Sequence, residues 1–166
     1  MSLAYVALGA NLADPATQVR AALVALSQLA SARLLRTSSL YRTAPVGIAH
    51  QPDFINAVAA LETTLAPHEL LDALFAIESE FGRRRDYYHA PRTLDLDLLL
   101  FDDRTIDSPT LKVPHPRLHL RAFVLQPLVE IAPHCRIPGR GNADAWLAAV
   151  SMQRIERLES GDGTQP

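Results

Sequence analysis

The sequence predicts an α+β fold with a ferredoxin-like β-α-β-β-α-β core, an antiparallel sheet, an extra hairpin and C-terminal helices. Short apolar runs typical of strands alternate with segments of helical apolar spacing, in the order strand, helix, strand, strand, helix, strand. With 166 residues, 48% of them hydrophobic, the chain also has enough apolar material for one domain with a substantial core.

The first half of the core is predicted as a strand, a helix and two further strands. The strands are expected at residues 3–8, 33–42 and 54–62. Asp14 and Pro15 mark the start of the helix, because Asp is a favoured N-cap and Pro fits the first helical position. This half therefore supplies three of the four core strands.

The second half is predicted as a helix and a strand followed by smaller elements. Pro67 begins the helix, and Gly82 ends it as a C-cap. Its apolar stripe is expected to comprise Leu70, Leu71, Leu74, Phe75 and Phe81. A strand follows from Asp95. The extra hairpin is expected near 104–113, and the C-terminal helices near 121–131 and 142–150.

The composition excludes several classes of partner. A formal net charge of −2 argues against nucleic acid, which is bound by basic surfaces. No apolar run approaches the roughly 18 residues of a membrane span, and the N-terminus has no basic signal-peptide region. The single cysteine fits a reducing compartment. We expect a cytoplasmic monomer with one domain over 1–158 and a flexible tail over 159–166.

The alternation of leucine and aspartate after residue 93 is the most informative pattern. Asp95 and Asp97 alternate with leucines in a predicted strand, so the two carboxylates leave the same face of that strand. A Mg²⁺ ion shared with substrate phosphates takes one or two protein carboxylates. The alternative is a solvated strand face, but Asp is a poor strand residue and the metal interpretation is favoured.

Basic side chains precede this pair. Arg83 and Arg85 follow the second helix, and Arg92 ends the same segment. A run of charge is more often a solvated surface, yet beside two carboxylates it favours a clamp for a triphosphate. Further on, His115 and Arg121 are candidates for phosphate contacts from the opposite side.

A second group of residues suits a flat heterocycle. Phe54 and Asn56 share one strand face, where a ring can stack and an amide can pair with an amide edge. Core packing is the alternative for Phe54, and Phe123 is a candidate for an opposing ring. Glu78 lies on the apolar stripe of the second helix, where it orients an arginine, contacts a nucleotide or occupies the helix edge.

Three function classes remain open on these residues. The main hypothesis is a phosphoryl-transfer enzyme that binds a triphosphate and Mg²⁺, although no P-loop, dinucleotide or kinase glycine motif is present. A ligand-sensing domain would not need the acidic pair together with the arginines. A two-metal pyrophosphatase or nuclease would need further carboxylates, and none is clearly placed with the pair.

Taken together, the motifs resemble the 6-hydroxymethyl-7,8-dihydropterin pyrophosphokinase family, from Ala4 to about residue 150. The most specific segments are Pro91-Arg92-Thr93-Leu94-Asp95-Leu96-Asp97 and Val113-Pro114-His115-Pro116-Arg117. The resemblance implies transfer of pyrophosphate from ATP to the hydroxymethyl group of the pterin, with release of AMP, in folate biosynthesis. It also implies two Mg²⁺ ions bound with ATP.

The resemblance assigns a role to each candidate residue. The metal ligands are Asp95 and Asp97. The catalytic residues are Arg83, Arg92 and Asp97. The ATP contacts are Glu78, Arg85, Arg92, His115 and Arg121. The pterin contacts are Thr43, Pro45, Val46, Phe54, Asn56 and Phe123.

Overall fold

The computed structural model describes residues 1–12, 14–44, 52–82 and 94–158, which form a mixed fold of helices and antiparallel sheet. The elements up to residue 101 are β1 (Ser2–Ala10), α1 (Pro15–Ser27), β2 (Ala32–Thr37), β3 (Tyr41–Thr43), β4 (Phe54–Thr63), α2 (Pro67–Glu80) and β5 (Asp95–Phe101). The later elements are β6 (Ile106–Asp107), β7 (Lys112–Val113), the 3-10 helix η1 (Leu118–Leu120), α3 (Ala122–Ile131), β8 (Arg136–Ile137), β9 (Gly141–Asn142), α4 (Ala143–Ala149) and β10 (Glu156–Arg157). The predicted α+β class is confirmed.

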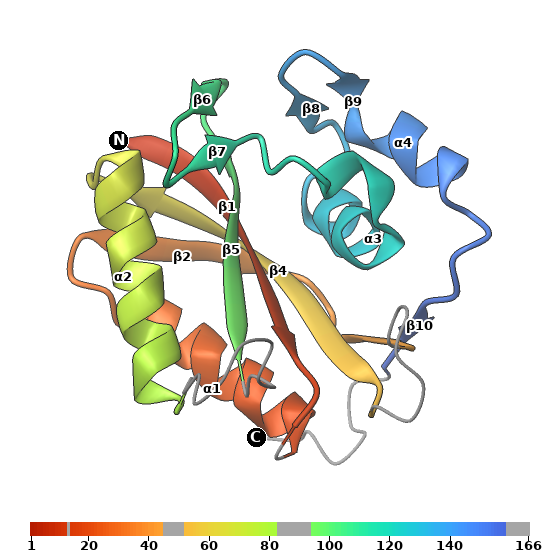
Figure 1. The fold of residues 1–166 in the computed structure, drawn as a ribbon, viewed down its shortest axis with the longest axis horizontal. Helices are drawn as coiled ribbons and strands as arrows, with labels where there is room; N and C mark the ends of the chain where they lie inside the picture. The colour runs from red at the N-terminus through yellow and green to blue at the C-terminus, as the bar shows by residue number, and fades with distance from the viewer. Residues whose placement is uncertain (13, 45–51, 83–93, 159–166) are drawn as a thin grey trace.

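The main sheet has the strand order β10-β3-β4-β1-β5, and β2 also pairs with β4. Every pairing in this sheet is antiparallel. Helices α1 and α2 cover one face, and α3 and α4 lie on the other (Figure 1). Residues 55–61 of β4 are all buried, because both faces of this central strand are covered.

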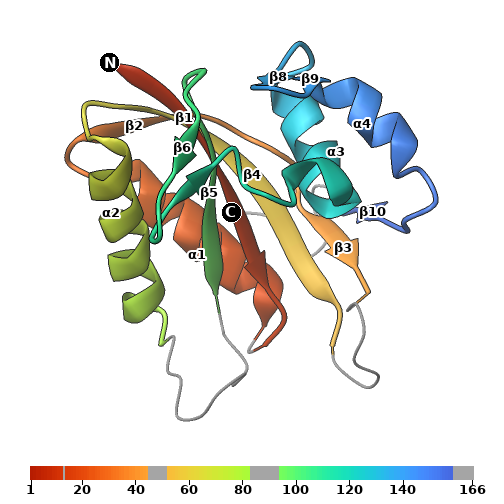
Figure 2. The same cartoon turned by 45° about the horizontal axis from the view of Figure 1, so that its top comes forward.

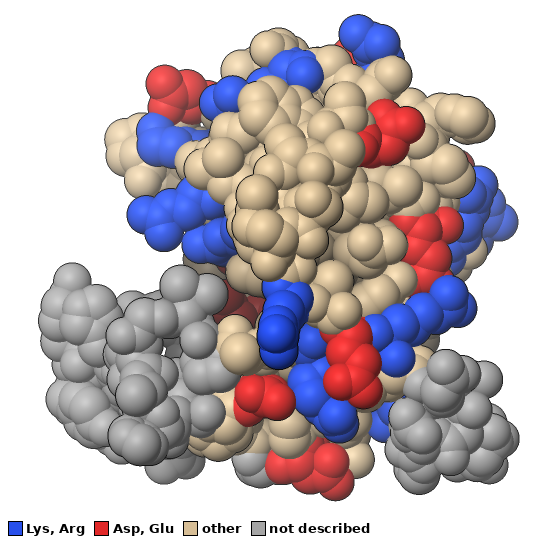
Figure 3. Space-filling view, turned by 90° about the vertical axis from the view of Figure 1, so that its right-hand side faces the viewer, with Lys and Arg blue, Asp and Glu red and all other residues tan. Residues whose placement is uncertain are grey.

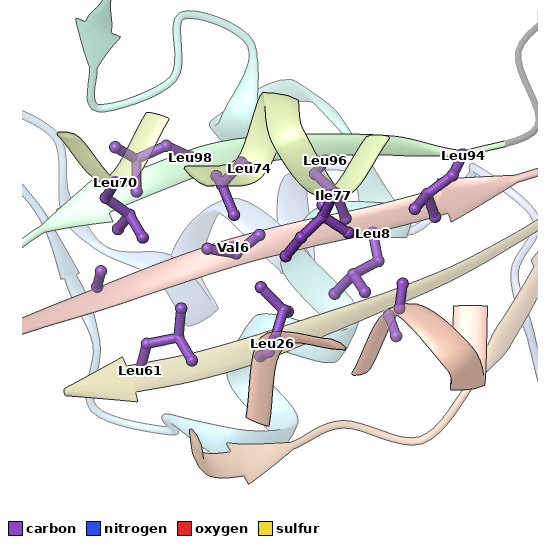
Figure 4. Packing of buried hydrophobic residues seen from close by; sticks show 14 of the residues in the cluster. Val6, Leu8, Leu26, Leu61, Leu70, Leu74, Ile77, Leu94, Leu96 and Leu98 are labelled. Atoms are coloured by element: carbon purple, nitrogen blue, oxygen red, sulfur yellow. The ribbon is translucent and has the colours of Figure 1, made fainter. Parts of the chain in front are cut away.

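The core on the α1 and α2 side is built by alternate residues of the strands. Val6 and Leu8 of β1 meet Leu26 of α1 and Leu74 of α2, and all four are buried (Figure 4). Side chains at alternate strand positions share one face, which explains why these residues point the same way. Burial of each such side chain contributes about 1.5–3 kcal/mol of transfer free energy.

A second core lies between the sheet and α3. Val58 of β4 and Leu99 of β5 are buried there with Leu125 and Leu128 of α3. Figure 2 shows α3 lying across β4 with α4 outside it. The sheet is therefore the middle layer of the molecule. In the part of the chain that is described, no helix has the length and apolar character needed to cross a membrane.

The segment 33–42 was predicted as one strand and forms two. Ser38 interrupts it: its amide donates to the carbonyl of Val58, and its hydroxyl oxygen accepts from the amide of Val58 at 2.9 Å. A side-chain oxygen thus takes the place of a backbone acceptor, and regular pairing stops. Ser39 then bonds to Glu130 of α3 instead of to the sheet.

Asp14 is the N-cap residue of α1 and Pro15 is its first residue, as predicted. Asp14 has φ 59° and makes no side-chain cap bond, because its carboxylate instead accepts from the Thr17 hydroxyl at 2.9 Å. One residue of the predicted α2 stripe was placed wrongly. Phe75 was placed in the stripe of α2 and is 46% exposed. Gly82, with φ 77°, follows the C-cap residue Phe81 in the left-handed conformation typical of helix ends.

The predicted hairpin is present as β6 and β7, and the C-terminal helices are present as α3 and α4. The β8–β9 hairpin and β10 were not predicted. Each of these strands has only two residues, too few for an alternating apolar pattern to appear.

Candidate active site

A cavity of about 820 Å³ opens between the sheet and the start of α3. Its position follows from the side chains that β1 presents to the α3 side. Tyr5 and Ala7 pack against the second core, and Ala7 and Gly9, further along the strand, line the cavity. The decrease in side-chain size leaves space above the sheet. This volume is within the range of small-molecule sites.

The strand register places the acidic pair and the predicted amide in one row. Asp95 of β5 lies opposite Gly9, and Gly9 lies opposite Asn56 of β4. Directly paired residues share a sheet face, so all three face the cavity. Asp97 lies opposite Ala7 and also lines the cavity. The sequence prediction that both carboxylates leave the same face is confirmed.

The predicted pterin contacts that are described also gather here. Thr43, Phe54 and Asn56 line the cavity from the sheet, and Phe123 lines it from α3. The Asn56 side-chain amide donates to the Thr43 hydroxyl at 2.9 Å, and both residues are buried. This bond fixes the plane of the amide. The structure therefore brings together two aromatic rings and an oriented amide.

Arg121 adds positive charge to the same space. It lines the cavity, and its guanidinium carbon lies 5.4 Å from the centre of the Phe123 ring. Burial lowers the pKa of Arg121, whereas the carboxylates of Asp97 and Asp95 act in the opposite direction. Opposite charges therefore face each other across the cavity. Phosphate groups and a cation together would satisfy both sets.

His115 lies beside this charged group and does not line the cavity itself. Burial lowers the pKa of His115, and the charges of Arg121 and Arg117 lower it further. Its Nδ1 accepts from the backbone amide of Arg117 at 3.2 Å. A neutral imidazole that accepts at Nδ1 carries its proton at Nε2, so His115 can donate from Nε2 to an anion.

Glu78 is placed differently from the other predicted ATP contacts. It is 1% exposed on α2, and its carboxylate accepts from the backbone amide of Leu96 at 2.7 Å. Leu96 is the residue between Asp95 and Asp97. Glu78 does not line the cavity. It is a buried residue that contacts the backbone between the two aspartates, so the helix-edge alternative is wrong.

Five predicted site residues lie outside the described residues: Pro45, Val46, Arg83, Arg85 and Arg92. Conversely, sequence reasoning assigned no role to Arg117, Gln153 and Arg154, which line the cavity. Arg117 belongs to a quoted motif, whereas Gln153 and Arg154 follow the last predicted helix and carried no signal. On the face seen in Figure 3, basic and acidic side chains are interspersed.

The described donors fit a metal shared with a ligand better than a metal held by protein alone. Among the described residues, no group of three or more His, Cys, Asp or Glu side chains could hold an ion. Two carboxylates are nevertheless enough for Mg²⁺ when phosphate oxygens and water complete the coordination. The set of donors therefore favours a metal that arrives with a phosphorylated substrate.

Fold and cavity define an α+β protein with a small-molecule site that combines an acidic pair, basic side chains and aromatic rings. Residues 5–133 match the family described as 7,8-dihydro-6-hydroxymethylpterin-pyrophosphokinase, and the chain belongs to this family.

Bacterial relatives cover nearly the whole chain. The chain is 54% identical over 154 residues to a 2-amino-4-hydroxy-6-hydroxymethyldihydropteridine pyrophosphokinase of Pseudomonas aeruginosa. This alignment covers 93% of this chain and 95% of the relative. A protein of the same name from Haemophilus influenzae is 49% identical over 138 residues, with 83% and 86% covered.

Solved structures share the fold at low sequence identity. A Plasmodium falciparum HPPK-DHPS crystal structure with pteroate has a TM-score of 0.73 at 14% identity, covering 89% of this chain and 42% of that one. An HPPK-DHPS structure in complex with substrates has a TM-score of 0.76 at 12% identity, covering 96% and 47%. The chain thus spans less than half the length of these two structural relatives.

Proposed function

We propose that this chain transfers the pyrophosphoryl group of ATP to the hydroxymethyl group of 6-hydroxymethyl-7,8-dihydropterin and releases AMP, in folate biosynthesis. Membership of the family supports the reaction. The observation that carries it is that one cavity of the described structure is lined by the acidic pair, an oriented amide and two aromatic rings. In the transfer, the hydroxymethyl oxygen bonds to the β-phosphorus, and the bond from that phosphorus to the AMP oxygen breaks.

The pterin would lie between Phe54 and Phe123. Asn56 donates one amide N–H to Thr43, and its Oδ1 and second N–H offer an acceptor and a donor to the amide edge of the pterin. Thr43, Pro45 and Val46 would complete this part of the pocket. A planar ring between two aromatic side chains gains apolar contact and stacking, while the amide sets its orientation.

Asp95 and Asp97 would hold two Mg²⁺ ions together with ATP, and ATP phosphate oxygens and water would complete the coordination. When bound, the metal supplies positive charge that stabilises the transferred phosphoryl group. Asp97 would in addition assist loss of the proton from the hydroxymethyl group. Burial lowers the pKa of Arg121, and the charges of these aspartates act against that lowering. This closeness to a basic residue of the cavity supports their placement near the ATP phosphates.

The remaining roles concern the phosphates and the nucleotide. Arg121 and the Nε2–H of His115 would donate to phosphate oxygens. Arg83 and Arg92 would stabilise charge during transfer, and Arg85 and Arg92 would contact ATP. Glu78 would act at the nucleotide side through its contact with β5.

We also assign the core to the ferredoxin-like arrangement. The order β5-β1-β4, followed by β2 and β3 along the far edge of β4, supports this assignment if β2 and β3 count as one interrupted strand. The monomeric state, the cytoplasmic location and the domain limits 1–158 stay predictions.

Nucleotide product analysis tests the proposal. The chain is incubated with ATP and Mg²⁺, with and without the pterin, and the nucleotides are separated. AMP that appears only with the pterin is the expected result. Release of ADP, or of phosphate without pterin, would contradict pyrophosphoryl transfer. ATP binding without any turnover would favour a ligand-sensing domain.

A further inference from the structure

The C-terminal segment, residues 151–158, connects two walls of the cavity. It leaves α4, passes the junction of η1 and α3, and pairs as β10 with β3. Figure 1 shows this path from α4 to β10 beside the sheet. Gln153 and Arg154 of the segment line the cavity, on which Thr43 of β3 and Phe123 of α3 also lie.

The Gln153 side chain forms hydrogen bonds with the backbone on both sides of Arg121. Its side-chain Oε1 accepts from the Ala122 amide at 2.9 Å, and its Nε2 donates to the Leu120 carbonyl at 2.9 Å. Ala122 is the first residue of α3, and its amide has no acceptor within the helix. Arg121, the N-cap residue, makes no side-chain cap. Gln153 therefore supplies from another segment the acceptor that the helix start lacks.

Arg121, which lies between the two backbone groups bonded to Gln153, is one of the charged residues that line the cavity. Arg121 has extended backbone angles, φ −123° and ψ 113°, between η1 and α3. Its guanidinium lies over the Phe123 ring, and both side chains line the cavity. Fixing the peptide groups before and after Arg121 fixes the direction in which its side chain leaves the backbone. The same bond at Ala122 holds the helix turn that carries Phe123.

We propose that Gln153 is a positioning residue for pyrophosphoryl transfer: it orients Arg121 toward the ATP phosphates and Phe123 toward the pterin. The inference rests on the proposed function of the cavity. Gln153 acts through the Leu120 carbonyl and the Ala122 amide, the backbone groups that flank Arg121, so it contributes to substrate binding by holding one wall of the cavity in place before the substrate arrives.

A purely structural role would predict a different pattern of effects. The segment stays attached to the sheet without Gln153, because β10 pairs with β3 and the Leu158 amide donates to the Leu40 carbonyl at 2.9 Å. Gln153 itself is exposed, so its removal takes little area out of the core. Loss of its two hydrogen bonds should therefore raise the KM values while changing the thermal unfolding midpoint little.

The test compares Gln153→Met, which keeps the side-chain length and loses both bonds, with Gln153→Glu, which keeps only an acceptor for the Ala122 amide. We expect Gln153→Met, which loses both hydrogen bonds, to raise the KM for ATP about tenfold, with a smaller change in kcat. Gln153→Glu should lie between it and wild type. Met152→Ala, at a 75% exposed neighbour, is the control and should match wild type.

A double-mutant cycle shows whether Gln153 acts through Arg121. In an Arg121→Ala background, Gln153→Met should leave the KM for ATP unchanged, because the oriented group is already absent. The same increase in both backgrounds would overturn the inference. An unchanged KM for the single variant would do so as well.

Hydrogen exchange at the Ala122 amide separates this inference from the proposed function, because it needs no turnover. Exchange should be faster in Gln153→Met than in wild type and in Met152→Ala. Equal rates would show that Gln153 does not protect the Ala122 amide, which would overturn the inference. If wild type releases no pterin-dependent AMP, the proposed function fails and the kinetic role of Gln153 fails with it. The exchange rates then still decide whether Gln153 holds the Ala122 amide in solution.

Discussion

Asp95 and Asp97 leave β5 on the cavity side, while Leu96 between them points into the core beneath α2. The two-residue period of a strand made this pair predictable, because it depends on local geometry alone. The roles of Gln153 and Gly9 were not predictable in the same way. Gln153 acts on residues more than thirty positions earlier, and no local pattern encodes such a contact.

Asp97→Asn tests the metal assignment at the scale of one residue. The amide keeps the size of the carboxylate and removes the charge that would hold Mg²⁺, so AMP formation should fall at least ~100-fold. The thermal unfolding midpoint should change little, because Asp97 is only partly buried. Asp103→Asn, at an exposed position beyond the end of β5, is the matched control. AMP formation close to the wild-type rate would contradict the assignment.

His115 gives the unfolding free energy a specific pH dependence. Burial lowers its pKa below the ordinary value of 6.5. The unfolded chain therefore takes up this proton first as the pH falls, and the folded state loses stability from about pH 7 downward through 6.5 toward the folded pKa.

The variant His115→Asn should weaken this acid-side loss, because Asn does not titrate and its Oδ1 can still accept from the Arg117 amide. The measurement is the thermal unfolding midpoint of both proteins between about pH 7 and pH 5. The pKa of His119 is also lowered, first by burial, but His119 is present in both proteins. The difference between the two curves therefore isolates His115, and parallel curves would contradict the prediction.

Between elements, the close approach of β1 and β4 shapes the pterin side of the cavity. A Cβ atom on Gly9 would lie 3.1 Å from Oδ1 of Asn56, which is tighter than ordinary contact. Gly9→Ala should therefore displace the Asn56 amide from its bond to Thr43 and raise the KM for the pterin about tenfold. The KM for ATP in the same variant is the internal control and should change much less. Equal changes in both KM values would count against the role of Asn56.

Most elements of the fold could be predicted because their signals are local: apolar period, prolines at helix starts and glycine at a helix end. The exceptions depend on distant partners. The interruption at Ser38 depends on a bond to Val58, and the path of Ser39 and Tyr41 depends on bonds to Glu130. β10 exists because β3 offers a free edge for pairing. None of these partners can be read from the neighbouring sequence.

For the molecule as a whole, the cavity lies where the start of α3 and the C-terminal segment meet the sheet. Residues from β1, β3, β4, β5, η1 and α3 line it, so it exists only in the complete fold. The individual candidates could be proposed from motifs, but their convergence required the sheet register and the position of α3. That Phe54 and Phe123 line one cavity is the clearest example.

The fate of the β-phosphorus of ATP tests the central claim most directly. ATP labelled at this atom is incubated with the chain, Mg²⁺ and the pterin, and the label is followed by chromatography. Pyrophosphoryl transfer predicts that all consumed label appears in the pterin product, with one AMP formed for each labelled pterin. Label that remains in ADP, or is released as inorganic phosphate or pyrophosphate while the pterin is unchanged, would contradict the account.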